Sequence, residues 1–242
     1  MHRLLPLLAL VLILLGVSNT VARAGKPQLY LSWHAPFGSP RASETLSMAS
    51  GDTTAADTLY LSFDPGHYDS TFLALDATIT VRCAEGDTLS SFWHWGSLGQ
   101  VQLGPRHARV EFNDTGTWPA PSPWRAVGIG QSAYDWTRQS ARVRLMYGIA
   151  VQQGAPLDSG TIYTIARLVV RHPAARITNA TQPLCFEWTG STFAYSNLLP
   201  EESVHYGDHR WVSLNSRGGA ICREYRESLR QAPRVWSPKK TP

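Results

Sequence analysis

The sequence is short of the residues on which several classes of protein depend. Its 242 residues contain only 3 cysteines and no CxxC pair, so a zinc module built on paired cysteines is excluded. An aspartate-rich calcium loop centred on glycine is also missing. The formal net charge of +4 is too small to favour nucleic acid or an anionic membrane as the partner. We therefore expect no metal, no cofactor and no nucleic acid.

Long apolar runs are absent except at the N-terminus. There, Arg3 precedes a leucine-rich run from Leu4 to Val17, and small residues at Ala22 and Ala24 suit a cleavage site. The run of about 14 residues is shorter than the roughly 20 that span a bilayer. We expect residues 1–24 to be a signal peptide, with an uncleaved anchor as the alternative. The mature chain is then predicted to be secreted or periplasmic, with no membrane span after cleavage.

Beyond the leader, apolar residues recur at every second position, which is the period of a β-strand, and helical spacing is almost absent. Residues 72–95 are predicted to form a β-hairpin, and only Cys222 to Gln231 could be helical. The pattern predicts an all-β fold, either a jelly-roll or an immunoglobulin-like β-sandwich of about nine or more strands with a short C-terminal helix. Residues 25–231 are expected to form one domain, and residues 232–242 a disordered tail. The predicted strands are 28–33, 57–63, 72–83, 87–95, 101–103, 108–112, 125–129, 141–150, 162–171, 184–188, 192–195 and 209–214.

The cysteines divide into a pair and a single thiol. Export permits a disulfide, and Cys185 and Cys222 make the best pair because both flank the C-terminal segment. Cys83 lies in phase with Ile79 and Val81 on a predicted strand. We therefore expect its thiol to face the core.

No group of residues forms a convincing catalytic pattern. The stretch around Ser132 lacks the second glycine of a nucleophile elbow. His205 and His209 have a metal-ligand spacing only on a helix, and a glycine between them favours a loop. Glu187 lies between aromatic residues, where burial would raise its pKa, but an outward-facing strand position is the favoured interpretation. No catalytic residue is predicted, and a secreted carbohydrate-active hydrolase on a jelly roll remains the alternative.

Aromatic residues are the better indication of a binding surface. Trp93 and Trp95 are two positions apart on a predicted strand, so they would share one face, although such a pair is more often in a core. Trp118 and Trp124 flank a proline-rich loop, and Tyr134 follows it. Exposed indoles stack on sugar rings and anchor protein interfaces. These five residues are the predicted ligand contacts.

Two stretches of the sequence resemble a known kind of domain. Residues 58–88 have a strand, a DPG turn and a long strand, and residues 141–171 end in the strand segment Ile165 to Val170. This layout is similar to cohesin-type and cellulose-binding-module-like bacterial domains. The resemblance implies a jelly-roll sandwich that binds a partner and does no chemistry. Residues 184–222 are additional to that pattern, so no binding residue is transferred.

Together these features predict a secreted, non-catalytic binding or structural module. Its partner would be a protein or a polysaccharide surface, contacted through the aromatic loops. A purely structural envelope protein is a further possibility, since it would need no concave aromatic surface.

Overall fold

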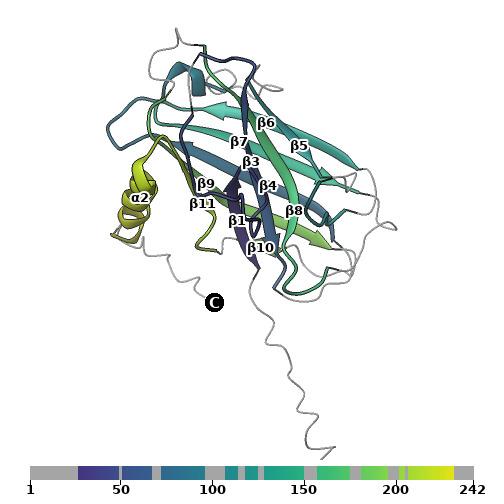
Figure 1. Cartoon of the computed structure of the whole chain (residues 1–242). Helices are drawn as coiled ribbons and strands as arrows, with labels where there is room; N and C mark the ends of the chain where they lie inside the picture. Colours follow the sequence, from purple (N-terminus) through teal and green to yellow (C-terminus); the bar gives the residue numbers. More distant parts are fainter. Residues whose placement is uncertain are drawn as a thin grey trace, which may run out of the picture.

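Two β-sheets pack face to face in the computed structural model of the chain (Figure 1). The structure describes residues 27–48, 51–66, 72–95, 107–113, 118–124, 128–149, 157–174, 181–195, 202–204 and 207–231. Sheet A has four strands in the order β1-β3-β8-β5. Sheet B has seven strands in the order β2-β11-β9-β4-β7-β6, with β10 paired to β9. The fold is a β-sandwich, as predicted.

Most strands lie where alternating apolar residues predict them. Sheet A consists of β1 (Gln28–Trp33), β3 (Ala56–Asp64), β5 (Ala108–Phe112) and β8 (Tyr163–Arg171). Sheet B consists of β2 (Thr45–Leu46), β4 (Phe72–Arg82), β6 (Ile129–Trp136), β7 (Ser140–Gly148), β9 (Leu184–Tyr195), β10 (Glu202–Val204) and β11 (Trp211–Leu214).

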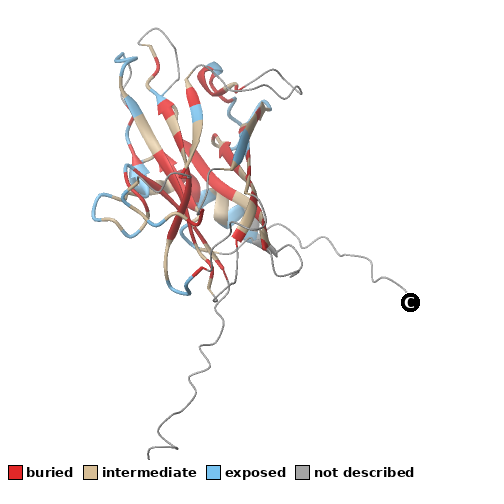
Figure 2. Cartoon of the chain, turned by 90° about the vertical axis from the view of Figure 1, so that its right-hand side faces the viewer, coloured by how far each residue is buried: buried red, intermediate tan, exposed pale blue. Residues whose placement is uncertain are grey.

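The core lies between the two sheets. Buried residues follow the strands of both sheets (Figure 2). On β3, Leu59, Leu61 and Phe63 are fully buried. The Phe63 ring contacts Phe72 of β4 at a centroid distance of 5.3 Å and Phe193 of β9 at 4.8 Å, so it joins sheet A to sheet B. The apolar residues at every second position are thus buried, because each strand presents one face to the opposite sheet.

The hairpin predicted over residues 72–95 is wrong in its second half. The first strand is β4, but Ser91–Trp93 form a 3₁₀ turn, capped by the Ser90 side chain, which accepts a hydrogen bond from Phe92 N at 3.4 Å. Strand β4 pairs with β7 on one side and with β9 on the other. Both of its hydrogen-bonding edges are therefore occupied, and no edge remains for a hairpin partner.

Other predicted boundaries also shift. Residues 184–188 and 192–195 join into the single strand β9, whose pairing with β4 shifts register between Thr78 and Ile79. The predicted strand 125–129 coincides with edge strand β6 only at Ile129, and residues 125–127 lie outside the described residues. The rest of β6 was not predicted, because Gly130 and Gln131 interrupt the apolar alternation. The predicted strand 101–103, the leader 1–24 and the tail 232–242 lie outside the described residues.

The C-terminal helix α2 (Ala220–Gln231) packs beside β9 and β11 (Figure 1). It follows a 3₁₀ turn over Arg217–Gly219, where Gly218 has φ 57°. The helix was predicted from residue 222, two residues later than it begins. No helix in the described parts of the chain is long and apolar enough to cross a membrane.

Candidate functional site

The structure places four of the five predicted aromatic contacts in the core. Trp93 and Trp95 are 0 % exposed, Tyr134 is 1 % exposed and Trp124 is 4 % exposed. A ligand cannot stack on a ring that is fully covered by protein atoms. The prediction that these four rings form a contact surface is therefore wrong for this structure.

The 3₁₀ turn explains why Trp93 and Trp95 point inward. Both indoles join the main core, where they contact each other at a centroid distance of 5.7 Å. Trp93 also meets Phe186 of β9 at 5.7 Å, and Trp95 meets Tyr134 of β6 at 6.0 Å. The pair therefore contributes to packing inside the core.

Trp118 differs from the other four because it is only half-buried. Its ring lies against the outer face of sheet A, edge-on to Tyr60 at 6.1 Å, and the Arg167 guanidinium lies 4.5 Å from its centroid. Arg167 Nε donates to Glu111 at 2.6 Å. Burial lowers the pKa of Arg167, but hydrogen bonds with Glu111 and Tyr60 outweigh this and raise it above its ordinary value. Of the predicted contacts, Trp118 is the one that borders solvent.

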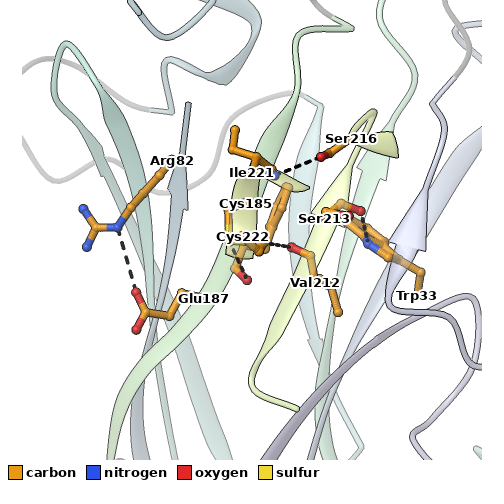
Figure 3. The surroundings of a disulfide bond; sticks show 10 residues. Trp33, Arg82, Cys185, Glu187, Val212, Ser213, Ser216, Ile221 and Cys222 are labelled. Atoms are coloured by element: carbon orange, nitrogen blue, oxygen red, sulfur yellow. Dashed lines mark hydrogen bonds and ion pairs between the residues drawn. A yellow bond between two sulfur atoms is a disulfide. The ribbon is translucent and has the colours of Figure 1, made fainter. Parts of the chain in front are cut away.

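The predicted disulfide is present and fastens helix α2 to sheet B (Figure 3). Cys185 of β9 is bonded to Cys222 of α2, 37 residues later. Both cysteines pack with Trp211 and Ile221 in a small apolar cluster that is separate from the main core. Cys83 is buried in the main core as predicted, and burial raises the pKa of its thiol.

Glu187 faces outward from the sandwich but is buried near α2, and its charged neighbours are arginines. Its carboxylate lies 3.9 Å from Arg82 (Figure 3). It also lies 3.3 Å from Arg210. The Arg82 guanidinium also lies 4.7 Å from the Tyr225 ring of α2. Burial raises the pKa of Glu187, although the two arginines act in the opposite direction. A glycosidase needs a second carboxylate facing the first, and here arginines occupy those positions.

The other catalytic candidates do not form a reactive group either. Ser132 lies on edge strand β6, and its hydroxyl donates to the Tyr134 hydroxyl at 3.3 Å. His209 Nδ1 lies 2.8 Å from the Glu44 carboxylate, and His205 is outside the described residues. Within the described segments, no group of three or more His, Cys, Asp and Glu side chains is arranged to hold a metal ion.

A broad part of the outer surface of sheet B carries side chains that the sequence did not single out as contacts. Helix α2 packs on β9 and β11, and the surface formed by β4, β7 and the adjoining part of β9 is hollowed into a shallow depression of about 570 Å³. Arg144 Nε donates to Asp76 at 2.9 Å, and Arg142 Nε donates to Asp135 at 2.7 Å. We call this surface the open face and define it by Asp76, Thr78, Thr80, Arg142, Arg144, Met146 and Thr192.

The open face continues into an apolar corner at edge strand β6. Ile129 is 79 % exposed and is the one large hydrophobic side chain that stands exposed among the described residues. It borders a second depression of about 370 Å³ together with Met146 and Ala194. In the sequence, Arg142, Arg144 and Met146 alternate with Val143, Leu145 and Tyr147, so they share one face of the strand. Spacing alone does not show that this face is uncovered.

Comparison with known proteins finds similar folds and no similar sequences. No family model and no curated protein sequence matches the chain. The chain is similar to cohesin modules. A type I cohesin from a cohesin–dockerin complex of Clostridium thermocellum is 10 % identical, with a TM-score of 0.38, over 78 % of this chain and 94 % of that one. A type II cohesin from a scaffoldin of Acetivibrio cellulolyticus is 7 % identical, with a TM-score of 0.38, over 79 % and 98 %.

These structures belong to the kind of domain that residues 58–88 and 141–171 resemble. No partner and no residue role follows from likenesses of this strength. What the chain binds must be argued from its own surface.

Proposed function

We propose that the chain is a secreted, non-catalytic binding module whose protein partner lies on the open face of sheet B. The observation that carries this proposal is the open face itself, a hollowed sheet surface next to the exposed Ile129. A single exposed apolar side chain is ordinary on a protein surface, so the proposal depends on the position of Ile129 beside the hollow.

The chemistry of the open face suits a protein better than a polysaccharide. Arginines, threonines and an aspartate surround the depression, and Met146 and Ile129 form its apolar corner. Protein interfaces combine apolar and polar contacts, and methionine and arginine are enriched in them. Sugar chains bind to exposed aromatic rings, and the described lining of the larger depression contains none.

Two further observations support the rest of the proposal. The contacts of Glu187 with Arg82 and Arg210 match a structural role rather than that of a general acid. The leader sequence and the Cys185–Cys222 bond both suit an oxidising compartment outside the cytosol. Detection of the chain without residues 1–24 in the periplasm or the medium would test the secretion part directly.

The test of the binding face uses charge reversal with a matched control. The double variant Arg142→Glu and Arg144→Glu reverses two exposed charges on the open face, whereas Arg171→Glu reverses one exposed charge at the end of β8. The immobilised full chain is used to capture secreted proteins, and dockerin modules are included as purified probes. The affinity of each purified partner is then measured for the three proteins.

We expect the double variant to weaken binding by at least tenfold and Arg171→Glu to change it by less than twofold. Like charges placed across an interface are strongly unfavourable, which gives the direction of the effect. A purified partner that binds the double variant as tightly as the wild type would show that the binding face lies elsewhere.

A further inference from the structure

A groove crosses the outer face of sheet A, on the other side of the sandwich from the open face. Its volume is about 560 Å³, within the range of roughly 300–1,000 Å³ that is typical of ligand sites. We propose that this groove binds an acidic saccharide, with Arg41 holding a sugar carboxylate. We call it the proline groove, and its apolar lining includes Pro36, Phe37, Tyr60, Pro119, Pro121 and Ile162.

One wall of the proline groove is the segment 34–41, which follows β1 and is held in place by its own hydrogen bonds. His34 N donates to Thr58 O at 2.9 Å, and the buried Ser32 hydroxyl donates to Ala35 O at 2.7 Å. Ser39 N donates to Pro36 O at 3.1 Å. His34 has φ 66°, an uncommon conformation for a residue other than glycine, and such conformations are concentrated at ligand sites.

The opposite wall is the loop 118–124, which is anchored through a buried asparagine. Asn113 is 0 % exposed, and its Nδ2 donates to Thr164 O at 3.0 Å and to Ala120 O at 3.4 Å. Thr164 N donates to Pro121 O at 2.9 Å, and the Ser122 hydroxyl donates to Asn113 O. Both walls are therefore preformed, so a ligand would not have to order them on binding.

The polar groups of the proline groove lie around its apolar floor. His34 and Ser39 offer hydrogen-bonding groups to sugar hydroxyls, and Arg41 adds a forked cation. Among the described residues, Arg41 has no ion-pair partner, and no carboxylate lines the groove. His34 Nδ1 lies 4.0 Å from the Asp57 carboxylate, and Asp57 is itself bound to His172 at 2.8 Å. An anionic group is the complement of this lining.

An oligosaccharide fits the proline groove better than a peptide does. The floor is the face of sheet A and not an edge, because Tyr60 lies on β3, which pairs with β1 and β8. Its backbone groups are therefore already used, and an extended peptide finds no strand to pair with. Pyranose rings need no backbone partner, since their apolar faces can pack on proline and aromatic side chains while their hydroxyls bond to the rim. Charge and shape together favour a chain of uronic acids.

Isothermal titration calorimetry on the full chain tests the site. The probes are trimers of galacturonate, mannuronate and glucuronate, a neutral cellotriose, and an acidic proline-containing peptide. Arg41→Ala removes the exposed cation without touching the core, and Arg171→Ala removes an exposed arginine elsewhere on sheet A. We expect at least one uronate trimer to bind more tightly than cellotriose, and Arg41→Ala to weaken that binding about tenfold or more. Arg171→Ala should leave the binding unchanged.

Four outcomes would overturn the proposal: no uronate binding at millimolar concentration, equal binding of cellotriose, binding that survives Arg41→Ala, or binding of the peptide alone. The inference is independent of the proposed protein partner. The open-face double variant Arg142→Glu and Arg144→Glu should bind the uronate trimer like the wild type. A negative result for one surface therefore does not count against the proposal for the other.

Discussion

Removal of the Cys185–Cys222 bond should have a large and calculable effect on stability. The bond joins residues separated by 37 positions. In the chain-entropy model, a loop of that length contributes about 4 kcal/mol, because the cross-link restricts the unfolded chain. We therefore expect the double variant Cys185→Ala and Cys222→Ala to lose about 4 kcal/mol in the free energy of unfolding.

Removal of the disulfide should also affect helix α2. It has 12 residues, which is too short for a stable helix in water without tertiary contacts. Its contacts with sheet B are the small cluster around Trp211 and Ile221 and the pairing of Tyr225 with Arg82. Without the covalent link, we expect the amide protons of α2 to exchange before those of β4 and β9, because the helix can open locally.

Urea denaturation followed by tryptophan fluorescence measures the loss, and hydrogen exchange measures the opening of α2. Wild-type protein treated with a reductant should match the double variant. Cys83→Ala is the matched control, since it removes a buried thiol without a cross-link and should cost only about 1 kcal/mol. A loss below about 1 kcal/mol, in a wild type shown by mass spectrometry to be oxidised, would refute the entropic reasoning.

Two further substitutions test the packing, and a third tests the buried carboxyl group of Glu187. Gly130→Ala should destabilise by about 1–3 kcal/mol, because an added Cβ would lie 2.5 Å from the Phe112 ring, as measured by urea denaturation. Trp93→Ala should cost about 3–5 kcal/mol in the same assay, since its indole is fully buried. Glu187→Gln should gain stability relative to the wild type as pH rises above the ordinary carboxyl range. Burial raises the pKa of Glu187, so the folded state binds its proton more tightly than the unfolded chain, and wild-type stability falls through that window.

Each of these has its own control. Gly148→Ala places a Cβ at an ordinary 3.7 Å from Ala74 and should be much milder than Gly130→Ala. Trp118→Ala removes a half-buried indole and should cost clearly less than Trp93→Ala; equal losses would contradict the burial described above. For Glu187, unfolding curves at several pH values must diverge from those of the variant. Parallel curves would show that the carboxyl group has an ordinary pKa in the folded state.

The sheets could be predicted where alternation is local and uninterrupted. Leu59, Leu61 and Phe63 alternate without a break, and their strand ends within one residue of its predicted limits. The turn at Ser91–Trp93 could not be predicted, because Trp93 and Trp95 have the spacing of a strand. A strand is excluded there because β7 and β9 already occupy both edges of β4. Which strands pair is decided by tertiary structure, and the spacing of apolar residues in the sequence does not reveal it.

The binding surfaces were harder to predict than the fold. Burial of Trp124 depends on Phe72 and Tyr147, which come from distant strands. The proline groove likewise brings the segment after β1 next to a loop before β6. A signal did exist for the open face, since Arg142 and Arg144 alternate with buried residues. Sequence alone could not tell that helix α2 leaves this part of sheet B uncovered.

The pairing between β2 and β11 has a consequence for the order of assembly. Thr45 and Leu46 run parallel to Ser213 and Leu214, and the Trp33 indole donates to Ser213 O at 3.1 Å across 180 residues of chain. The earliest segments of the fold therefore acquire their last neighbours only when the last strand, β11, is in place. A chain that ends before residue 211 would leave β2 and residues 184–187 of β9 without their partner strand, so sheet B is completed only when β11 is in place.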